Sequence, residues 1–242
     1  FISQIQGPKS MELLDKLISE PIAKTWKYFD WAEVTMDNEK VISSRTGFTN
    51  ELGWEIYFRP ENKTEKLGDL ILEEGSKMGM ILTGTPSFRG RRIEAGLLSA
   101  GQDFPNNTNP FTVGLGRFVD LNKDDFIGKK VLVNSDKKCR SWGLRVVDGV
   151  AKKGRTLKIN NELIGSVTSS TWSPYQVCGV GIVLLDNYEI GPESVVDVEC
   201  TDGKIHKAEI CTLPMYDPKG EIVRGLNTKI PTKPEPWRGI KN

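Results

Sequence analysis

The stretch Arg45–Tyr57 (RTGFTNELGWEIY) decides how the first half of this chain folds. It joins a Gly-containing turn to a short strand, along which side chains alternate between two faces. Trp54, Ile56 and Phe58 therefore share one face, which we expect to be buried. Glu55 points to the opposite face. If that face is wet, Glu55 is an ordinary surface acid. If it lines a pocket, the carboxylate needs N–H donors, which a flat heterocycle can supply.

The composition argues against several classes of function. The chain of 242 residues has 33 Lys and Arg against 32 Asp and Glu, so it gives no argument for nucleic acid or an anionic membrane as partner. No apolar run reaches the ~18 residues that a membrane-spanning helix needs. With 1 histidine, neither a histidine-based metal site nor a Ser-His triad is expected, and we predict no metal site. Four scattered cysteines predict reduced thiols in a cytoplasmic protein.

Two hydrophobic periods alternate in the first half of the chain. Apolar residues recur every three to four positions in the helical segments, and Pro86 marks the start of the third of them. Strand-like runs lie on both sides of the Gly-containing turn. This alternation predicts an α/β domain over residues 1–116. We expect helices at 9–19, 63–78 and 86–98, and strands at 41–45 and 54–58.

From Cys139 onward the chain becomes a series of short β-rich segments with turn signals between them. Asn160-Asn161 is a plausible tight hairpin turn. This spacing is typical of an antiparallel barrel or sandwich, which we expect over residues 139–242, with 117–138 as a connecting segment. We expect strands at 142–147, 156–159, 163–168, 180–185, 194–199 and 206–211.

Six segments also resemble, in order, motifs of the folate-dependent aminomethyltransferase family, which includes the T protein of the glycine cleavage system. Each match is weak alone, but together they extend across nearly the whole chain. They are Ile5–Ser10 (IQGPKS), Arg45–Tyr57 (RTGFTNELGWEIY), Arg92–Leu97 (RIEAGL) with Gly101–Asp103 (GQD), Asn109–Phe111 (NPF) with Gly114–Gly116 (GLG), Asp125–Lys129 (DFIGK), and Gly165–Ser169 (GSVTS) with Ser173–Pro174 (SP).

The resemblance implies an α+β fold, with ferredoxin-like α/β domains followed by a small antiparallel β-barrel around a central hole that holds the folate. The family places a long segment before the position of Phe1. We therefore expect the sequence to lack an N-terminal third. The aspartate that the T protein uses in catalysis would lie in that third, so no catalytic residue is named.

The same resemblance implies a set of residues that bind tetrahydrofolate. Glu55 matches the family glutamate that accepts hydrogen bonds from the pterin ring, and a carboxylate suits two N–H donors side by side. Tyr57 shares the face of Glu55 and is a second candidate. The alternative is that its ring only packs against neighbouring side chains and contacts no ligand. Arg92 is a candidate for the glutamyl tail, and the alternative is a salt bridge on the helix. Tyr216 matches a family tyrosine near the folate.

Two further residues are candidates for binding the substrate. Arg91 could hold a carboxylate with two parallel hydrogen bonds, unless it forms a surface salt bridge. Trp31 belongs to an aromatic group with Trp26, Tyr28 and Phe29, and aromatic faces attract a quaternary or sulfonium cation. Packing in the core is the alternative for this group. Glu94 is expected to be a structural partner.

One departure from the T protein affects the predicted reaction. Counted back from Gly96, Phe88 stands where that protein has an arginine. The string from Arg92 to Phe111 resembles more closely the dimethylsulfoniopropionate demethylase branch, although Ala100 stands where this branch has tyrosine. The resemblance therefore favours methyl transfer from a sulfonium acid to tetrahydrofolate, which gives 5-methyl-tetrahydrofolate.

Two alternatives stay open at this point. The first is aminomethyl transfer in the glycine cleavage system, with a lipoyl carrier protein as partner. The second is a non-catalytic folate-binding protein. A small-molecule substrate is expected for methyl transfer, and a lipoyl carrier protein is a possible partner if the first alternative holds.

Overall fold

The computed structural model describes residues 1–21, 26–229, 231 and 233–240. The chain divides into two compact units. The first unit consists of residues 1–91 with 219–232, and the second consists of residues 92–218 with 233–242.

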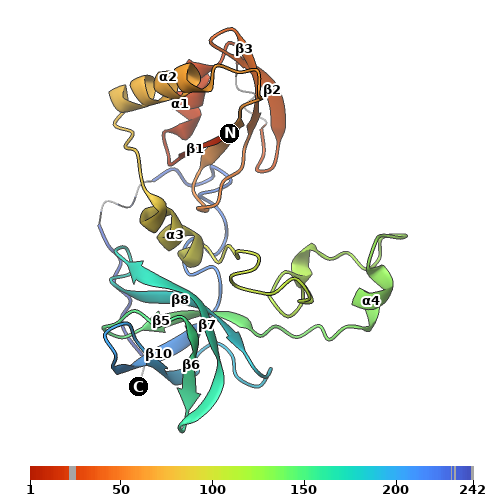
Figure 1. Ribbon diagram of the computed structural model, residues 1–242, viewed down its shortest axis with the longest axis vertical. Helices are drawn as coiled ribbons and strands as arrows, with labels where there is room; N and C mark the ends of the chain where they lie inside the picture. The colour runs from red at the N-terminus through yellow and green to blue at the C-terminus, as the bar shows by residue number, and fades with distance from the viewer. Residues whose placement is uncertain (22–25, 230, 232, 241–242) are drawn as a thin grey trace. The chain divides into compact units, whose positions relative to one another are not determined.

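A four-stranded antiparallel sheet, with strand order β1-β4-β3-β2, forms the base of the first unit (Figure 1). Asp37 and Asn38 have left-handed backbone angles, φ 47° and 65°, which suit the two-residue hairpin turn between β2 and β3. The strands β1 and β2 were not among those expected: β1 (ISQIQ) has no clean alternation of apolar and polar residues, and in β2 (WAEVTM) the alternation begins only after Trp31. The strands are β1 (Ile2–Gln6), β2 (Trp31–Met36), β3 (Glu39–Ser44) and β4 (Gly53–Tyr57).

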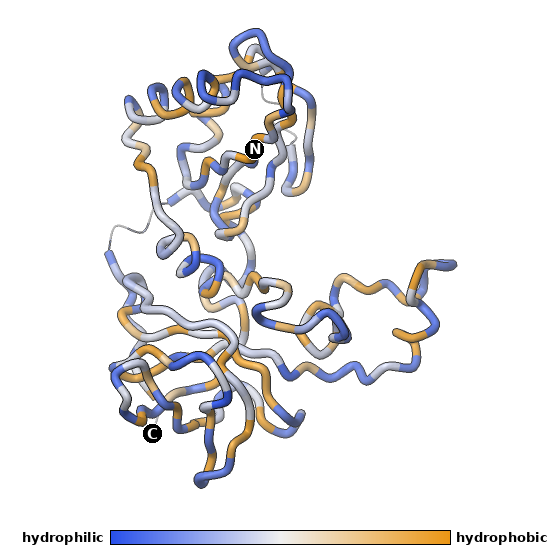
Figure 2. The backbone as a smooth tube through the Cα atoms, viewed as in Figure 1, coloured by the Kyte–Doolittle hydropathy of each residue, from blue (hydrophilic) through white to orange (hydrophobic). Residues whose placement is uncertain are grey.

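Two helices, α1 (Ser10–Leu17) and α2 (Thr64–Lys77), supply the rest of this unit's core. Hydrophilic and hydrophobic positions alternate along α2 (Figure 2), as the 3.6-residue period predicts. Trp54 and Ile56 are fully buried in one cluster with Leu14 of α1 and Leu67 of α2. The expected helices at 9–19 and 63–78 are confirmed, and so is the burial of one face of β4.

The second unit contains a closed barrel of six antiparallel strands, in the order β10-β5-β8-β7-β6-β9. Asn160 and Asn161 lie between β6 and β7 with φ 50° and 68°, which confirms the expected hairpin turn. Alternate side chains point inward and fill the barrel with branched residues. The strands are β5 (Ser141–Val146), β6 (Gly154–Ile159), β7 (Glu162–Ser173), β8 (Cys178–Leu185), β9 (Val195–Glu199) and β10 (Ile205–Cys211).

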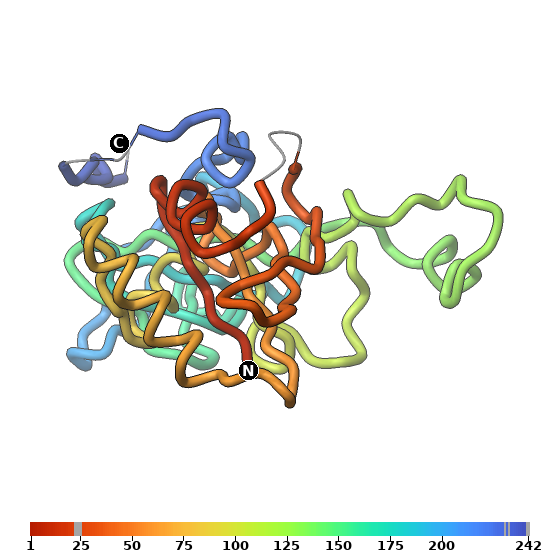
Figure 3. Tube along the Cα trace, turned by 90° about the horizontal axis from the view of Figure 1, so that it is seen from above, coloured from red at the N-terminus to blue at the C-terminus, as the bar shows by residue number. Residues whose placement is uncertain are grey.

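Three shorter elements lie between the sheet and the barrel in sequence. Helix α3 (Thr85–Glu94) ends four residues before the predicted 98, because Gly96 has a left-handed φ of 66°. The 3₁₀ turn η1 (Gly116–Phe118) and helix α4 (Lys129–Asn134) follow. In Figures 1 and 3 the green segment that carries α4 extends away from the barrel. The expected α+β class, with an antiparallel barrel after an α/β unit, is confirmed.

Candidate cofactor site

One face of the four-stranded sheet brings three of the predicted site residues together. Directly paired residues of an antiparallel sheet point to the same side. Gln4 is paired with Glu55, Glu55 with Ser44, and Ser44 with Trp31. These four residues form one row across the sheet, which we call the Glu55 face. Trp31 lies two strands from Glu55, which corresponds to about 10 Å.

Tyr57 is on the same face as Glu55, because the two residues are two apart in β4. Both side chains are half-buried, whereas Trp54 and Ile56 on the other face are fully buried. The alternation that the sequence predicts for β4 is therefore present in the structure. It leaves a carboxylate and a phenol at the surface of a rigid sheet.

Three donors surround the Glu55 carboxylate. The Gln4 side-chain amide donates to Oε1 at 2.8 Å, and the Tyr57 hydroxyl donates to Oε2 at 3.1 Å. The Thr46 hydroxyl also donates to Oε2, and its oxygen lies 3.1 Å from the Ser44 hydroxyl. A carboxylate offers about four acceptor positions, so this arrangement leaves room for a further donor at Oε1.

The charge of Glu55 affects the pKa of two tyrosines, Tyr57 and Tyr28. Burial and, next, the Glu55 carboxylate raise the pKa of Tyr57 above its ordinary range. The same two causes raise the pKa of Tyr28. Both phenols therefore stay protonated at neutral pH and can act as donors. The site is thus a carboxylate among hydroxyl groups, which suits a neutral ligand rich in N–H groups.

The predicted aromatic group is divided by the sheet. Trp26 packs edge-on against Trp54, with 5.1 Å between ring centroids, so core packing is the correct interpretation for it. The rings of Tyr28 and Phe29 pack against each other, with 4.2 Å between their centroids. Trp31 is 68% exposed, and core packing is wrong for this residue. Its predicted role in substrate binding stays a prediction, with an exposed ring on the Glu55 face in its favour.

The two neighbouring arginines of α3 have different partners. Arg91 forms an ion pair with Glu51 in the first unit. Arg92 is 4% exposed, and its guanidinium donates to Asp103 at 2.8 Å and to Ser169 at 2.7 Å. Both arginines form ion pairs, as the structural alternatives expected, but the pair of Arg92 is buried and does not lie on the helix surface. The predicted ligand roles of Arg91 and Arg92 stay predictions, and these contacts do not favour them.

A bulge in β7 explains why the Arg92 pair is so fully hydrogen-bonded. The register of β7 against β8 shifts between Val167 and Ser169, and a bulge re-aims the side chains beside it. Thr168 donates to Asp103 at 2.8 Å, and the Ser169 hydroxyl contacts the same carboxylate oxygen at 2.5 Å. We call Arg92, Asp103, Thr168 and Ser169 the Arg92 cluster. Its geometry indicates a structural role.

The remaining sequence candidates lie in the second unit. Tyr216 is 7% exposed, and its ring meets that of Tyr175 edge-on at 5.3 Å. Its backbone N–H donates to the carbonyl of Glu94 at 3.1 Å. The Glu94 carboxylate accepts from the Ser173 hydroxyl, which confirms that this acid is a structural partner. The predicted folate contact of Tyr216 stays a prediction.

Local sequence patterns miss three residues of the Glu55 site: Gln4, Ser44 and Thr46. Gln4 reaches Glu55 because β1 pairs with β4, a contact between residues about fifty positions apart in sequence. Local periodicity carries no information on such pairing. The sequence of β1, ISQIQ, has no clean alternation, so no local signal points to Gln4.

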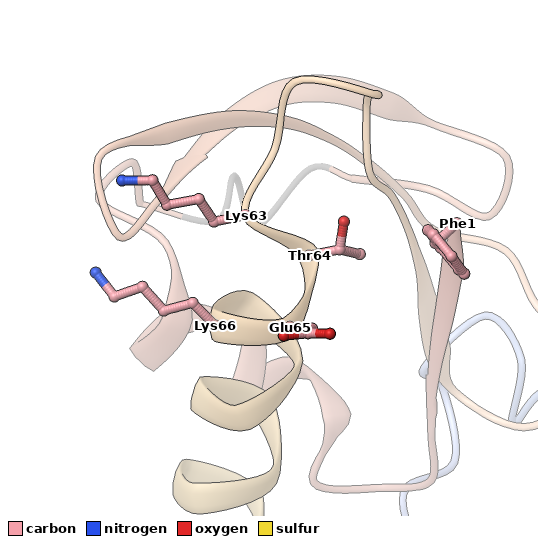
Figure 4. A pocket seen from close by; sticks show the side chains of 5 residues that line it. All are labelled: Phe1, Lys63, Thr64, Glu65 and Lys66. Carbon is pink, nitrogen blue, oxygen red and sulfur yellow. The ribbon is translucent and has the colours of Figure 1, made fainter.

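Other features of the described residues offer no rival site. A concave region of about 690 Å³ is lined by Phe1 and the start of α2, and Lys63 and Lys66 extend away from Phe1 (Figure 4). Burial raises the pKa of the Cys178 thiol to about 11, which makes it a poor nucleophile at neutral pH. Within the described part of the chain, no group of three metal-ligating side chains occurs, and no helix is long and apolar enough to cross a membrane.

Comparisons with known proteins agree on both halves of the chain. The profile of the GCVT N-terminal domain matches residues 2–123, and that of the glycine cleavage T-protein C-terminal barrel domain matches residues 140–217. An aminomethyltransferase of Anoxybacillus flavithermus is 34% identical over 218 residues, which are 88% of this chain and 59% of the relative. A probable aminomethyltransferase of Thermococcus gammatolerans is 32% identical over an alignment of 243 positions, gaps included, that covers 89% of this chain and 60% of the relative.

A solved structure shows the same fold. It is the crystal structure of glycine cleavage system aminomethyltransferase T from Bartonella henselae, with a TM-score of 0.75 and 22% identity. The match covers 90% of this chain and 60% of that one. The chain thus spans less than two thirds of the length of each of these three proteins.

Proposed function

Because this chain belongs to the glycine cleavage T-protein family, we propose that it serves tetrahydrofolate-dependent one-carbon transfer, as an aminomethyltransferase. In this reaction an aminomethyl group carried by a lipoyl protein passes to tetrahydrofolate, and ammonia is released. Such a carrier protein is then the macromolecular partner. The relatives described above bear the name aminomethyltransferase, which supports this proposal.

The observation that carries the proposal is the Glu55 carboxylate on the Glu55 face. It is held by hydroxyl donors on one oxygen and retains an acceptor position on the other. A pterin edge offers an N–H and an amino group side by side, and a carboxylate accepts both. The residues present therefore fit this cofactor. Tetrahydrofolate, when bound, supplies the nitrogen that takes up the one-carbon unit.

We assign the following roles to the chain's own residues. Glu55 orients the pterin through charge-assisted hydrogen bonds. Tyr57 is protonated at neutral pH, burial and the Glu55 charge raise its pKa further, and it remains a donor beside the carboxylate. The exposed ring of Trp31 forms an apolar wall on the same face. Orientation of this kind supplies much of the rate when two reactants must meet in a fixed geometry.

Demethylation of a sulfonium acid is the second candidate. Phe88 stands where the T protein has an arginine, and Trp31 presents an aromatic face to which a sulfonium cation is attracted. The names of the relatives favour aminomethyl transfer, so we place it first and reverse the order that the sequence alone indicated. The third candidate is a folate-binding protein without turnover.

One set of assays separates the three candidates. The protein is incubated with tetrahydrofolate and either an aminomethyl-loaded lipoyl carrier protein or dimethylsulfoniopropionate. We expect methylene-tetrahydrofolate and ammonia with the carrier protein. Formation of 5-methyl-tetrahydrofolate from the sulfonium acid alone would establish demethylation instead. Tight folate binding without either product would support the third candidate, a folate-binding protein without turnover. Absence of folate binding would contradict all three candidates.

A further inference from the structure

The two oxygens of Glu55 have different surroundings. Oε2 receives the hydroxyls of Thr46 and Tyr57, whereas Oε1 receives the side-chain amide of Gln4. Thr46 and Tyr57 are half-buried, but Gln4 is exposed. One oxygen is therefore held from within the protein, and the other is held by a side chain at the surface.

Thr46 is fixed more firmly than a surface hydroxyl. Its backbone carbonyl accepts from the Gln6 side-chain amide at 3.3 Å, and its hydroxyl oxygen lies 3.1 Å from that of the buried Ser44. Because Thr46 has one hydroxyl proton and a carboxylate can only accept, that proton goes to Glu55 and Ser44 donates to Thr46. Such a chain of hydroxyls strengthens its own links.

Gln4 has the opposite character. It belongs to the edge strand β1, and its amide donates a single N–H to Oε1 over 2.8 Å. An exposed hydrogen bond of this kind exchanges readily with water and contributes little to stability. A ligand that brings N–H donors to Glu55 needs acceptor positions, and those on Oε2 are already filled.

We propose that Thr46 is a positioning residue that fixes the Glu55 carboxylate, and that Gln4 holds the place on Oε1 that a ligand N–H takes over. This inference rests on the proposed folate site. It predicts effects of opposite sign for two residues that donate to the same carboxylate. Loss of the Thr46 hydroxyl weakens binding, because Glu55 must then be ordered by the ligand. Loss of the Gln4 amide removes a competitor.

The test is calorimetric titration of the protein with tetrahydrofolate. Thr46→Val should weaken binding roughly five- to tenfold, in line with the cost of immobilising one side chain. Thr46→Ser keeps the hydroxyl and should bind as the wild type does. Gln4→Ala should bind up to about threefold tighter, since an exposed amide competes only weakly.

A matched control comes from the same sheet. Thr35 on β2 donates to Glu20 at 2.6 Å, so Thr35→Val breaks a similar threonine–glutamate pair outside the site. It should leave the affinity for tetrahydrofolate unchanged. Urea unfolding of each variant shows whether a change in affinity follows a change in stability.

A second measurement does not depend on folate. High-resolution crystal structures of the ligand-free wild type and Thr46→Val should show Glu55 in a single rotamer in the former and in several in the latter. A single, unmoved Glu55 rotamer in Thr46→Val would overturn the positioning role. Affinity of Gln4→Ala equal to or weaker than that of the wild type, with unchanged stability, would overturn the place-holding role. Wild-type protein that binds no tetrahydrofolate would contradict the proposed function, and the crystal structures would still decide the role of Thr46.

Discussion

Two carboxylates of this molecule, Glu55 and Asp103, both belong to matched family motifs and both accept hydrogen bonds from hydroxyl groups. Asp103 is 1% exposed and also binds the guanidinium of Arg92 and the backbone N–H of Ser99, each at 2.8 Å. Glu55 is half-buried and has no guanidinium among the hydrogen-bond partners that the structure describes.

The two carboxylates differ in the number of hydrogen-bond acceptor positions that remain unoccupied. Asp103 is saturated by charged and neutral donors in the interior, where an unpaired charge would be costly. Glu55 keeps an acceptor position beside an exposed, exchangeable amide. The number of donors and the burial thus distinguish a saturated structural carboxylate from one that retains an acceptor position.

The largest effect should come from breaking the Arg92 cluster. Arg92→Ala leaves Asp103 buried without its cation, which should lower the free energy of unfolding by about 3–5 kcal/mol. Its sequence neighbour is the control: Arg91 pairs with the half-buried Glu51, so Arg91→Ala should cost about 1 kcal/mol or less. Urea unfolding followed by circular dichroism measures both. Equal losses of unfolding free energy in the two variants would contradict the claim that the buried, saturated Asp103 depends more on its cation than the half-buried Glu51 does.

The turn at Val177, next to the buried Gln176, gives a second test of how buried polar groups hold the barrel in place. Val177 has a φ of 52°, a left-handed conformation that β-branched residues rarely adopt. The preceding Gln176 is held by Ser173 and Arg145, each at 2.8 Å, which keeps the turn in place. Val177→Gly should therefore raise the free energy of unfolding by about 1 kcal/mol. Val177→Ala should gain less, and a destabilised glycine variant would show that the turn carries no strain.

The smallest expected effect is a titration within the Glu55 site. Burial and the Glu55 charge raise the pKa of Tyr57 above its ordinary value of about 10. The folded state then holds this proton more tightly than the unfolded state, so the contribution to stability is complete below pH ~10 and is lost as the pH rises through the folded pKa. Glu55→Gln should lower the pKa of Tyr57 toward its ordinary value. Phenolate absorbance, with Tyr57→Phe as the reference, measures the shift, and an unchanged titration would contradict the coupling.

Much of this fold follows from local sequence patterns. The 3–4 spacing in α1 and α2, the alternation in β4 and the Asn160-Asn161 turn are all local signals, and each is present in the structure. The end of α3 was misplaced, because the left-handed Gly96 was not weighed against the helical pattern. The domain boundaries predicted at residues 116 and 139 stay a prediction.

The candidate site was harder to predict, for a physical reason. The sequence placed Glu55 and Tyr57 on one face, but the partners of Glu55 come from β1 and the turn after β3. Trp31 reaches the same face only through the pairing of β2 with β3. Arg92 and Asp103 form their buried pair because the chain folds back onto a bulge in β7. Such contacts depend on long-range pairing, which local periodicity does not encode.

The measurement that tests the central claim most directly is a calorimetric titration of tetrahydrofolate into the wild type, Glu55→Gln and Glu33→Gln. Glu33 lies on β2, on the same face as Tyr57 and two strands from it, and pairs with Arg59, so its substitution removes a charge from this face without touching the Glu55 carboxylate. We predict that Glu55→Gln binds more weakly by about 1.5–3 kcal/mol, with an unfolding free energy close to that of the wild type, while Glu33→Gln binds normally. Equal affinity of the wild type and Glu55→Gln would contradict the account.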